Sequence, residues 1–266
     1  MILYKIKVVA ASKILLDEYF GGMDLNLVWL GFILEIMLVA NIKPFITEFV
    51  GVGIILVQLH MIFSVIVLMS YKLEEKYVFL FAYLSRVAFM FWDLYASHIY
   101  SLPNSGSDSE SYYKQAVYFS ENINLLSSNQ VELYSKIIGS VFYLTGPERI
   151  IGQYINVLLG LSIVFIVYKL LLILEVDKQI AKIILLIASF FPNALIMSAI
   201  FLREIFPTFL LAASLYFFIK WLKYQRLPHA ILSLGALGIA SIFHSGVIGV
   251  ALGYFFGFLF YDKTQN

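Results

Sequence analysis

Residues 230–260 read AILSLGALGIASIFHSGVIGVALGYFFGFLF and contain no charged side chain. A single helix of these 31 residues would be about 46 Å long, which exceeds the roughly 30 Å of a bilayer's hydrocarbon core. His244-Ser245-Gly246 stands near the middle of the stretch, so we expect the helix to break there. The stretch therefore predicts two consecutive membrane segments.

The composition of the whole chain agrees with a membrane location. Of the 266 residues, 61% are hydrophobic and 13% are charged, with a mean hydropathy of +0.89, whereas soluble domains have about 45–50% apolar and about 25% charged residues. The net charge of +1 does not indicate a nucleic-acid partner. The chain has no cysteine, which excludes disulfides, thiolate zinc sites and a cysteine nucleophile.

Six further apolar stretches precede the last one. They cover residues 25–42, 49–70, 78–98, 150–174, 183–202 and 205–222. We therefore expect an all-α polytopic membrane protein with seven to eight transmembrane helices, forming a single integral membrane domain over residues 1–266. The first twenty residues carry three lysines around a short apolar run, and we interpret them as an interfacial helix rather than a signal peptide.

The distribution of basic residues predicts the orientation. With the N-terminus inside, eleven basic residues fall at cytoplasmic ends: Lys5, Lys7, Lys13, Lys72, Lys76, Lys169, Lys178, Lys182, Lys220, Lys223 and Arg226. Five fall outside: Lys43, Lys114, Lys136, Arg149 and Arg203. By the positive-inside rule we expect a multi-pass protein of the plasma membrane whose polar loop, residues 100–149, faces outward.

This loop shows two helical patterns after the turn signal Pro103-Asn104-Ser105-Gly106. In the second pattern, five apolar residues share one face: Val131, Tyr134, Ile138, Val141 and Phe142. Such amphipathic helices are expected to lie on the outer leaflet with the apolar side down.

Ionisable residues within spans are costly and are functional candidates. Arg86 and Asp93 lie two turns apart on one helix face, so they either form an ion pair, direct or through another span, or bind a charged substrate. Glu35 and His60 stand alone in their spans, and each is expected to be an inward-facing packing residue.

Two carboxylates open the outer loop. Ser107-x-x-Glu110 fits a capping box, in which Ser107 is the N-cap of the helix that carries Tyr112 and Tyr113. Alternatively, Asp108 or Glu110 acts as a general base towards an acceptor hydroxyl. Either carboxylate is also a suitable ligand for Mg²⁺ or Mn²⁺, so the cofactor is expected to be either a divalent cation or none.

Two cationic candidates lie at the same side by the predicted topology. Arg203-Glu204 is either an ordinary interfacial turn or a site where Arg203 faces a lipid-linked phosphate. His244 is either part of a helix-breaking turn or a donor to a phosphate or a sugar hydroxyl. A carboxylate base beside cationic groups suits transfer from a phosphate-activated lipid.

Several motifs resemble known membrane enzymes. The segment 104–113, NSGSDSESYY, resembles the acidic first outer loop of GT-C-type glycosyltransferases and a segment of Wzy/EpsG-type polysaccharide polymerases. The span that starts near Gly146-Pro147 resembles the one that follows this loop in both families. Leu202-Arg203-Glu204 and the later Ser241-Ile-Phe-His244 are most similar to the polymerase pattern.

The resemblance implies an enzyme that moves sugars from polyprenyl-(pyro)phosphate-linked donors on the extracytoplasmic face. It implies Asp108 and Glu110 as catalytic carboxylates, and Arg203 and His244 as residues that bind phosphate or sugar. Arg86 and Tyr113 are further candidates for binding phosphate or sugar. Expected partners are a polyprenyl-linked glycan, the lipid bilayer and other membrane proteins of polysaccharide assembly. Members of these families usually have more spans, so we expect a short form, a truncated chain or one completed by a partner.

We therefore expect a polymerase of surface-polysaccharide repeat units. The alternatives are a GT-C enzyme that transfers a single sugar and a non-catalytic transporter or scaffold subunit of glycan export. Transporters commonly hold their polar residues at mid-membrane on broken helices, whereas here the candidates gather at the outer side.

Overall fold

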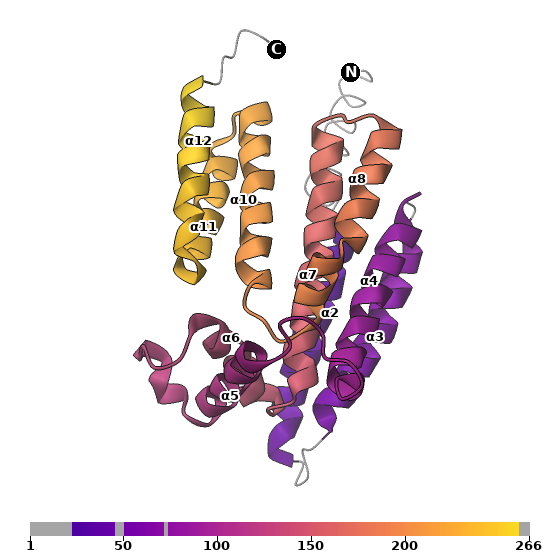
Figure 1. Ribbon diagram of the computed structural model, residues 1–266, viewed down its shortest axis with the longest axis vertical. Helices are drawn as coiled ribbons and strands as arrows, with labels where there is room; N and C mark the ends of the chain where they lie inside the picture. The colour runs from indigo at the N-terminus through magenta and orange to yellow at the C-terminus, as the bar shows by residue number, and fades with distance from the viewer. Residues whose placement is uncertain (1–22, 46–50, 72–73, 261–266) are drawn as a thin grey trace, which may run out of the picture.

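The computed structural model describes residues 23–45, 51–71 and 74–260, and within these ranges the chain is all-α (Figure 1). Five of the described helices are long and apolar enough to cross a membrane. They are α2 (Met23–Ile42), α3 (Val52–Ser70), α4 (Lys76–Phe91, continued by the π-helix η2, Trp92–Ala96), α7 (Arg149–Ile173) and α10 (Ile205–Tyr224). The expected N-terminal interfacial helix lies outside the described residues.

The span expected at residues 183–202 is divided. It consists of α8 (Lys178–Phe190) and α9 (Pro192–Ala199), whose axes differ by 44°. Proline has no N–H to continue the hydrogen-bond ladder of α8, and Pro192 starts the new helix. Counted as one crossing, the pair raises the number of possible spans in the described residues to six.

The last apolar stretch breaks where its length predicted. Helix α11 (Leu227–Phe243) is followed by the short turn η4 (Ser245–Val247) and by α12 (Ile248–Phe260). His244 between them is extended, with φ −152° and ψ 117°. Both helices are shorter than the other candidate spans. The described residues therefore contain five or six candidate spans, fewer than the seven to eight expected from the sequence.

Helix α7 is the central element of the bundle. Every residue from Ile150 to Ser162 is buried, and a helix enclosed on all sides carries no polar stripe. Two glycines let neighbours approach closely. A Cβ on Gly152 would lie 2.3 Å from the Phe201 ring, and one on Gly160 would lie 2.4 Å from the Ser198 side chain.

The loop 100–149 forms α5 (Ser107–Glu121), the short helix η3 (Ile123–Ser127) and α6 (Leu133–Thr145). Figure 1 shows α5 and α6 across one end of the bundle, where α7 and α10 begin. The apolar stripe of α6 exists as predicted, but Tyr134, Ile138 and Phe142 are at most 1% exposed within the protein. The expectation that this face meets the membrane is therefore wrong, because other helices cover it.

Candidate functional site

The structure brings the outer-loop helices, the turn before α10 and the end of α11 to one end of the bundle (Figure 1). Arg203 in that turn contacts Glu132 at the start of α6. Phe206 at the start of α10 and Phe243 at the end of α11 have ring centroids 5.8 Å apart. The elements that carry the predicted site residues Asp108, Glu110, Tyr113, Arg203 and His244 therefore share this end.

Arg203 is held by side chains from three elements, which we call the Arg203 cluster: Tyr112, Glu132, Arg203 and Glu204. Its Nη1 lies 2.5 Å from Oε2 of Glu132, and its Nε lies 3.5 Å from Oε1 of Glu204. Its guanidinium carbon lies 5.6 Å from the ring centroid of Tyr112, a cation–π distance. Partial burial lowers the pKa of Arg203, but the hydrogen bond to Glu132 and the nearby charges of Glu132 and Glu204 together outweigh burial and leave the pKa above its ordinary value.

Asp108 stands in the first turn of α5 and is exposed. It makes no hydrogen bond or ion pair with any residue that the structure describes. Positions four apart on a helix share a face, so Asp108 lies one turn from Tyr112. Burial, and to a lesser degree the negative charges of Glu132 and Asp108, raise the pKa of Tyr112 to about 12. A free carboxylate and the guanidinium of Arg203 thus lie beside the same tyrosine.

Glu110 is also on this turn but is paired with Arg149, the first residue of α7. Arg149 also donates from Nη2 to the hydroxyl of Ser109 over 2.8 Å. The capping-box interpretation is wrong, because Gly106 is the N-cap of α5, Ser107 is already helical and no side chain caps the helix. Since the charge of Glu110 is compensated, Asp108 is the better candidate for a base.

Tyr113 contacts the residues at the start of α7. Its hydroxyl donates to the carbonyl of Pro147 over 2.9 Å, and Arg149 lies over its ring at 5.6 Å. The ring also packs against Phe201 with centroids 5.7 Å apart. These contacts describe a residue that positions α5 on the start of α7, while its hydroxyl oxygen can still accept a hydrogen bond.

His244 is exposed at the end of α11. Its Nδ1 accepts a hydrogen bond from the backbone N–H of Gly246 over 3.1 Å. An imidazole that accepts at Nδ1 carries the proton of its neutral form on Nε2. The helix-breaking turn predicted from the sequence is therefore present, and the Nε2–H of His244 is not used by it.

Arg86 and Asp93 do not form the direct ion pair that was one of the two alternatives for them. Asp93 accepts hydrogen bonds from the Ser105 hydroxyl and, over 2.5 Å, from Nε2 of Gln153, and it lies 3.9 Å from Nη2 of Arg149. We call Asp93, Glu110, Arg149 and Gln153 the Arg149 cluster. It joins the end of α4 to the loop and to α7.

Arg86 turns to the bend between α8 and α9. Its Nη1 donates to the carbonyls of Ala82 and Ser189 over 2.9 and 3.0 Å. The Ser189 carbonyl belongs to the last turn of α8, where cations are favoured by the helix dipole. Only 1% of Arg86 is exposed.

Glu35 and His60, expected to stand alone, lie against each other between α2 and α3. Oε2 of Glu35 is 3.0 Å from Nδ1 of His60, and His60 is fully buried. His60 faces inward as predicted, and the two residues, each isolated within its own span, meet because α2 and α3 are neighbours.

Three residues of this end were not predicted as contacts: Glu132, Arg149 and Asn156. Asn156 is fully buried in α7 and donates to the carbonyls of Ile200 and Leu202. An amide inside an apolar span is the sequence signal that could have indicated it. Glu132 and Arg149 look like ordinary loop charges in the sequence.

A metal site finds limited support in the described part of the chain, where no group of three or more His, Asp or Glu side chains is arranged to hold an ion. Of the two predicted ligands, Glu110 is engaged by Arg149, whereas Asp108 is available.

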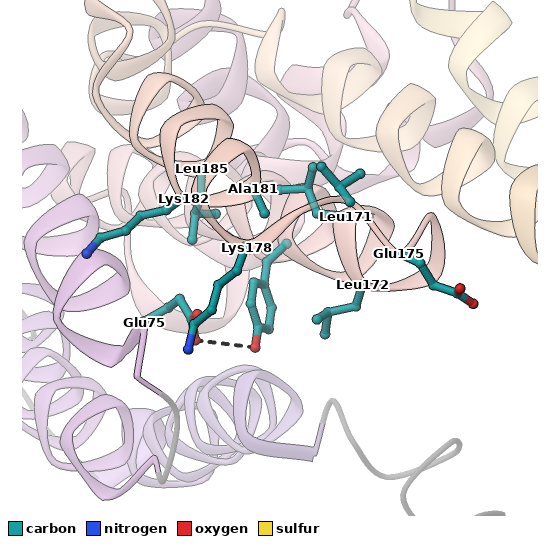
Figure 2. A pocket seen from close by; sticks show the side chains of 10 residues that line it. Glu75, Leu171, Leu172, Glu175, Lys178, Ala181, Lys182 and Leu185 are labelled. Atoms are coloured by element: carbon teal, nitrogen blue, oxygen red, sulfur yellow. Dashed lines mark hydrogen bonds between the residues drawn. The ribbon is translucent and has the colours of Figure 1, made fainter.

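A cavity of about 230 Å³ lies at the other end of α7, away from the predicted site residues. Figure 2 shows Glu75 and Lys178 among the side chains that line it, and the hydroxyl of Tyr168 donates to Glu75 over 3.4 Å. Lys178 is already paired with Glu74 over 2.6 Å. None of the predicted site residues lines this cavity, so the candidate site is the end formed by α5, α6 and the turn before α10.

The apolar helices and the polar clusters at one end define a class, that of multi-pass α-helical membrane proteins. The chain matches no family model, no curated protein and no solved structure.

Proposed function

We propose that the chain is an integral membrane glycosyltransferase that uses polyprenyl-(pyro)phosphate-linked sugars on the extracytoplasmic face and polymerises repeat units of a surface polysaccharide. The observation that carries the proposal is the position of the free carboxylate of Asp108, one helical turn from the tyrosine on which Arg203 stacks. Sugar transfer from a phosphate needs a base for the acceptor and fixed positive charge for the leaving group.

Asp108 accepts the proton of an acceptor hydroxyl, and the hydroxyl oxygen forms a bond to the anomeric carbon of the donor sugar. The bond between that carbon and the phosphate oxygen breaks, and the phosphate leaves with the electron pair. Arg203 and the Nε2–H of His244 donate to the departing phosphate, which is where negative charge develops. The proton remains on Asp108 until the product leaves.

The surroundings of this site support the same proposal. The excess of basic residues on the opposite side of the predicted topology favours a plasma-membrane protein with the loop 100–149 outside. The bilayer supplies the lipid-linked glycan, and other polysaccharide-assembly proteins are proposed as partners. If a divalent cation takes part, Asp108 is the ligand on offer, since Glu110 is committed to Arg149.

A transporter or scaffold subunit of glycan export is the second candidate. The bend between α8 and α9, with the buried Arg86 against it, favours this alternative, because broken helices bind substrates in transporters. A GT-C enzyme that adds one sugar is the alternative within the enzyme class.

The experiment is complementation of cells that lack the native protein. We expect Asp108→Asn and Arg203→Ala to insert normally and to lower glycan extension by at least about 100-fold. Glu121→Gln is the matched control, because Glu121 is an exposed acid at the other end of α5. A ladder reduced to single repeat units indicates polymerisation, and a unit that lacks one sugar indicates single-sugar transfer. Normal extension by both variants contradicts an enzymatic role.

A further inference from the structure

A cavity of about 220 Å³ lies at the bend between α8 and α9. It is enclosed by α4, α7, α8, α9 and α10, and its polar lining includes Arg86, Glu204 and Thr208. Pockets that enclose a drug-sized ligand measure roughly 300–1,000 Å³. The cavity is therefore suited to a headgroup rather than to a whole glycan.

Arg86 is a buried cation whose charge is not matched. Nη1 is used by two backbone carbonyls, whereas Nε is buried and has no hydrogen-bond partner. No carboxylate of the residues that the structure describes lies within ion-pairing distance of Arg86. A charge in a low-dielectric interior is costly unless it is paired. The geometry therefore calls for an anion from outside the chain.

Glu204 lies on another wall of the cavity and belongs also to the Arg203 cluster. Its Oε1 lies 3.5 Å from Nε of Arg203, while its Oε2 is buried without a hydrogen-bond partner. A carboxylate oxygen of this kind accepts a hydrogen bond from a hydroxyl group. The cavity thus offers a cation for an anionic group and an acceptor for a neighbouring hydroxyl.

The rest of the lining is mostly apolar and reaches the surface of the bundle. Phe191, at the bend, lines the cavity and is 56% exposed. Because the chain is largely apolar and Phe191 lies between two apolar helices, we expect its exposed ring to face lipid. A ligand that carries a hydrocarbon chain can therefore place its headgroup in the cavity and its chain along this surface.

We propose that this cavity binds the phosphate of a long-chain lipid, with Arg86 as its counter-cation and Glu204 accepting from an adjacent hydroxyl. The choice of a phosphate-bearing lipid rests on the proposed function. The site is distinct from the Arg203 cluster, with which it shares only Glu204. It is a membrane-level subsite next to the proposed catalytic end, linked to it by Glu204.

The test is binding of farnesyl phosphate, farnesol and inorganic phosphate to the purified full chain, measured by native mass spectrometry. We expect farnesyl phosphate to bind at least about tenfold more tightly than either other probe. Arg86→Met is expected to weaken its binding by about tenfold or more. Lys178→Met, at the other end of the bundle, removes an exposed charge and is expected to leave binding unchanged.

Ala194→Leu fills the cavity without removing a charge and is expected to weaken binding similarly, so it decides the matter if Arg86→Met does not fold. Equal binding of farnesol shows that phosphate is not recognised, and equal binding of inorganic phosphate shows a free-anion site; either result overturns the proposal. The proposal is also overturned if the folded Arg86→Met and Ala194→Leu variants bind farnesyl phosphate within about twofold of wild type. Asp108→Asn should abolish transfer and keep farnesyl phosphate binding, so a failure of the proposed function is distinguishable from a failure of this site.

Discussion

The side-chain amide of Asn156 donates a hydrogen bond to the backbone carbonyl of Leu202 over 3.0 Å. The same amide nitrogen donates to the carbonyl of Ile200 over 2.7 Å, and the amide oxygen accepts from the hydroxyl of Tyr134 over 3.4 Å. One buried side chain of α7 thereby fixes both α6 and the turn before α10. The position of Arg203, the next residue of that turn, depends on this tether.

Asn156→Leu is expected to destabilise the protein. It keeps the side-chain size but leaves two buried carbonyls without a donor, and each buried unsatisfied group costs about 1–3 kcal/mol. Thermal unfolding in detergent should show a lower midpoint, and glycan extension should fall because Arg203 is no longer held. Asn129→Leu, at an exposed position, should change neither. An unaltered midpoint for Asn156→Leu would show that the tether is not needed.

Arg149→Gln is expected to destabilise the protein because it leaves the buried carboxylate of Asp93 without a cation. Breaking a buried ion pair costs about 3–5 kcal/mol, and we expect less here since the two groups are 3.9 Å apart and Arg149 is 21% exposed. The double variant Asp93→Asn/Arg149→Gln should be more stable than Arg149→Gln alone. Additive losses in this double-mutant cycle would show that the two residues do not interact.

Gly160→Ala is expected to lower stability by about 1–3 kcal/mol through overpacking. The added methyl group would lie 2.4 Å from Cβ of Ser198 and 2.9 Å from Nε of Arg86. Gly235→Ala is the matched control, since a Cβ there meets nothing within 4 Å. Alanine at that helical position should add about 0.5–1 kcal/mol. Unfolding measurements should therefore give shifts of opposite sign, and shifts of the same sign would contradict the packing of α7 on α9.

The helices were predictable because apolar runs of membrane length leave the backbone no other way to satisfy its polar groups. The need for a break in the last apolar stretch followed from its length, and its position followed from His244-Ser245-Gly246. The bend at Pro192 was not predicted, although the proline was visible in the sequence. The apolar face of α6 was predicted, but its burial by other helices was not. A periodic pattern indicates which face of a helix is buried and does not indicate whether protein or lipid covers it.

The candidate site was predictable only in part. Alternation of the spans placed Asp108 and Arg203 at the same end, and in the structure Arg203 lies over the ring of Tyr112, one helical turn from Asp108 on α5. The partner of Arg203 is 71 residues away in the sequence, and no local pattern indicates such a contact. The direct ion pair that was one alternative for Arg86 is not formed for a related reason, because long side chains reach neighbouring helices as easily as their own.

The side of the membrane on which the loop 100–149 lies can be tested with single cysteines, because the chain contains none. Asn129 is exposed between α5 and α6, and Lys178 is exposed at the start of α8. Helix α7, about 37 Å long, separates these two regions and is long enough to cross a bilayer. We expect a membrane-impermeant maleimide to label Asn129→Cys in intact cells and Lys178→Cys only after lysis. The reverse pattern would put Asp108 and Arg203 in the cytosol, where no extracytoplasmic lipid-linked sugar could reach them.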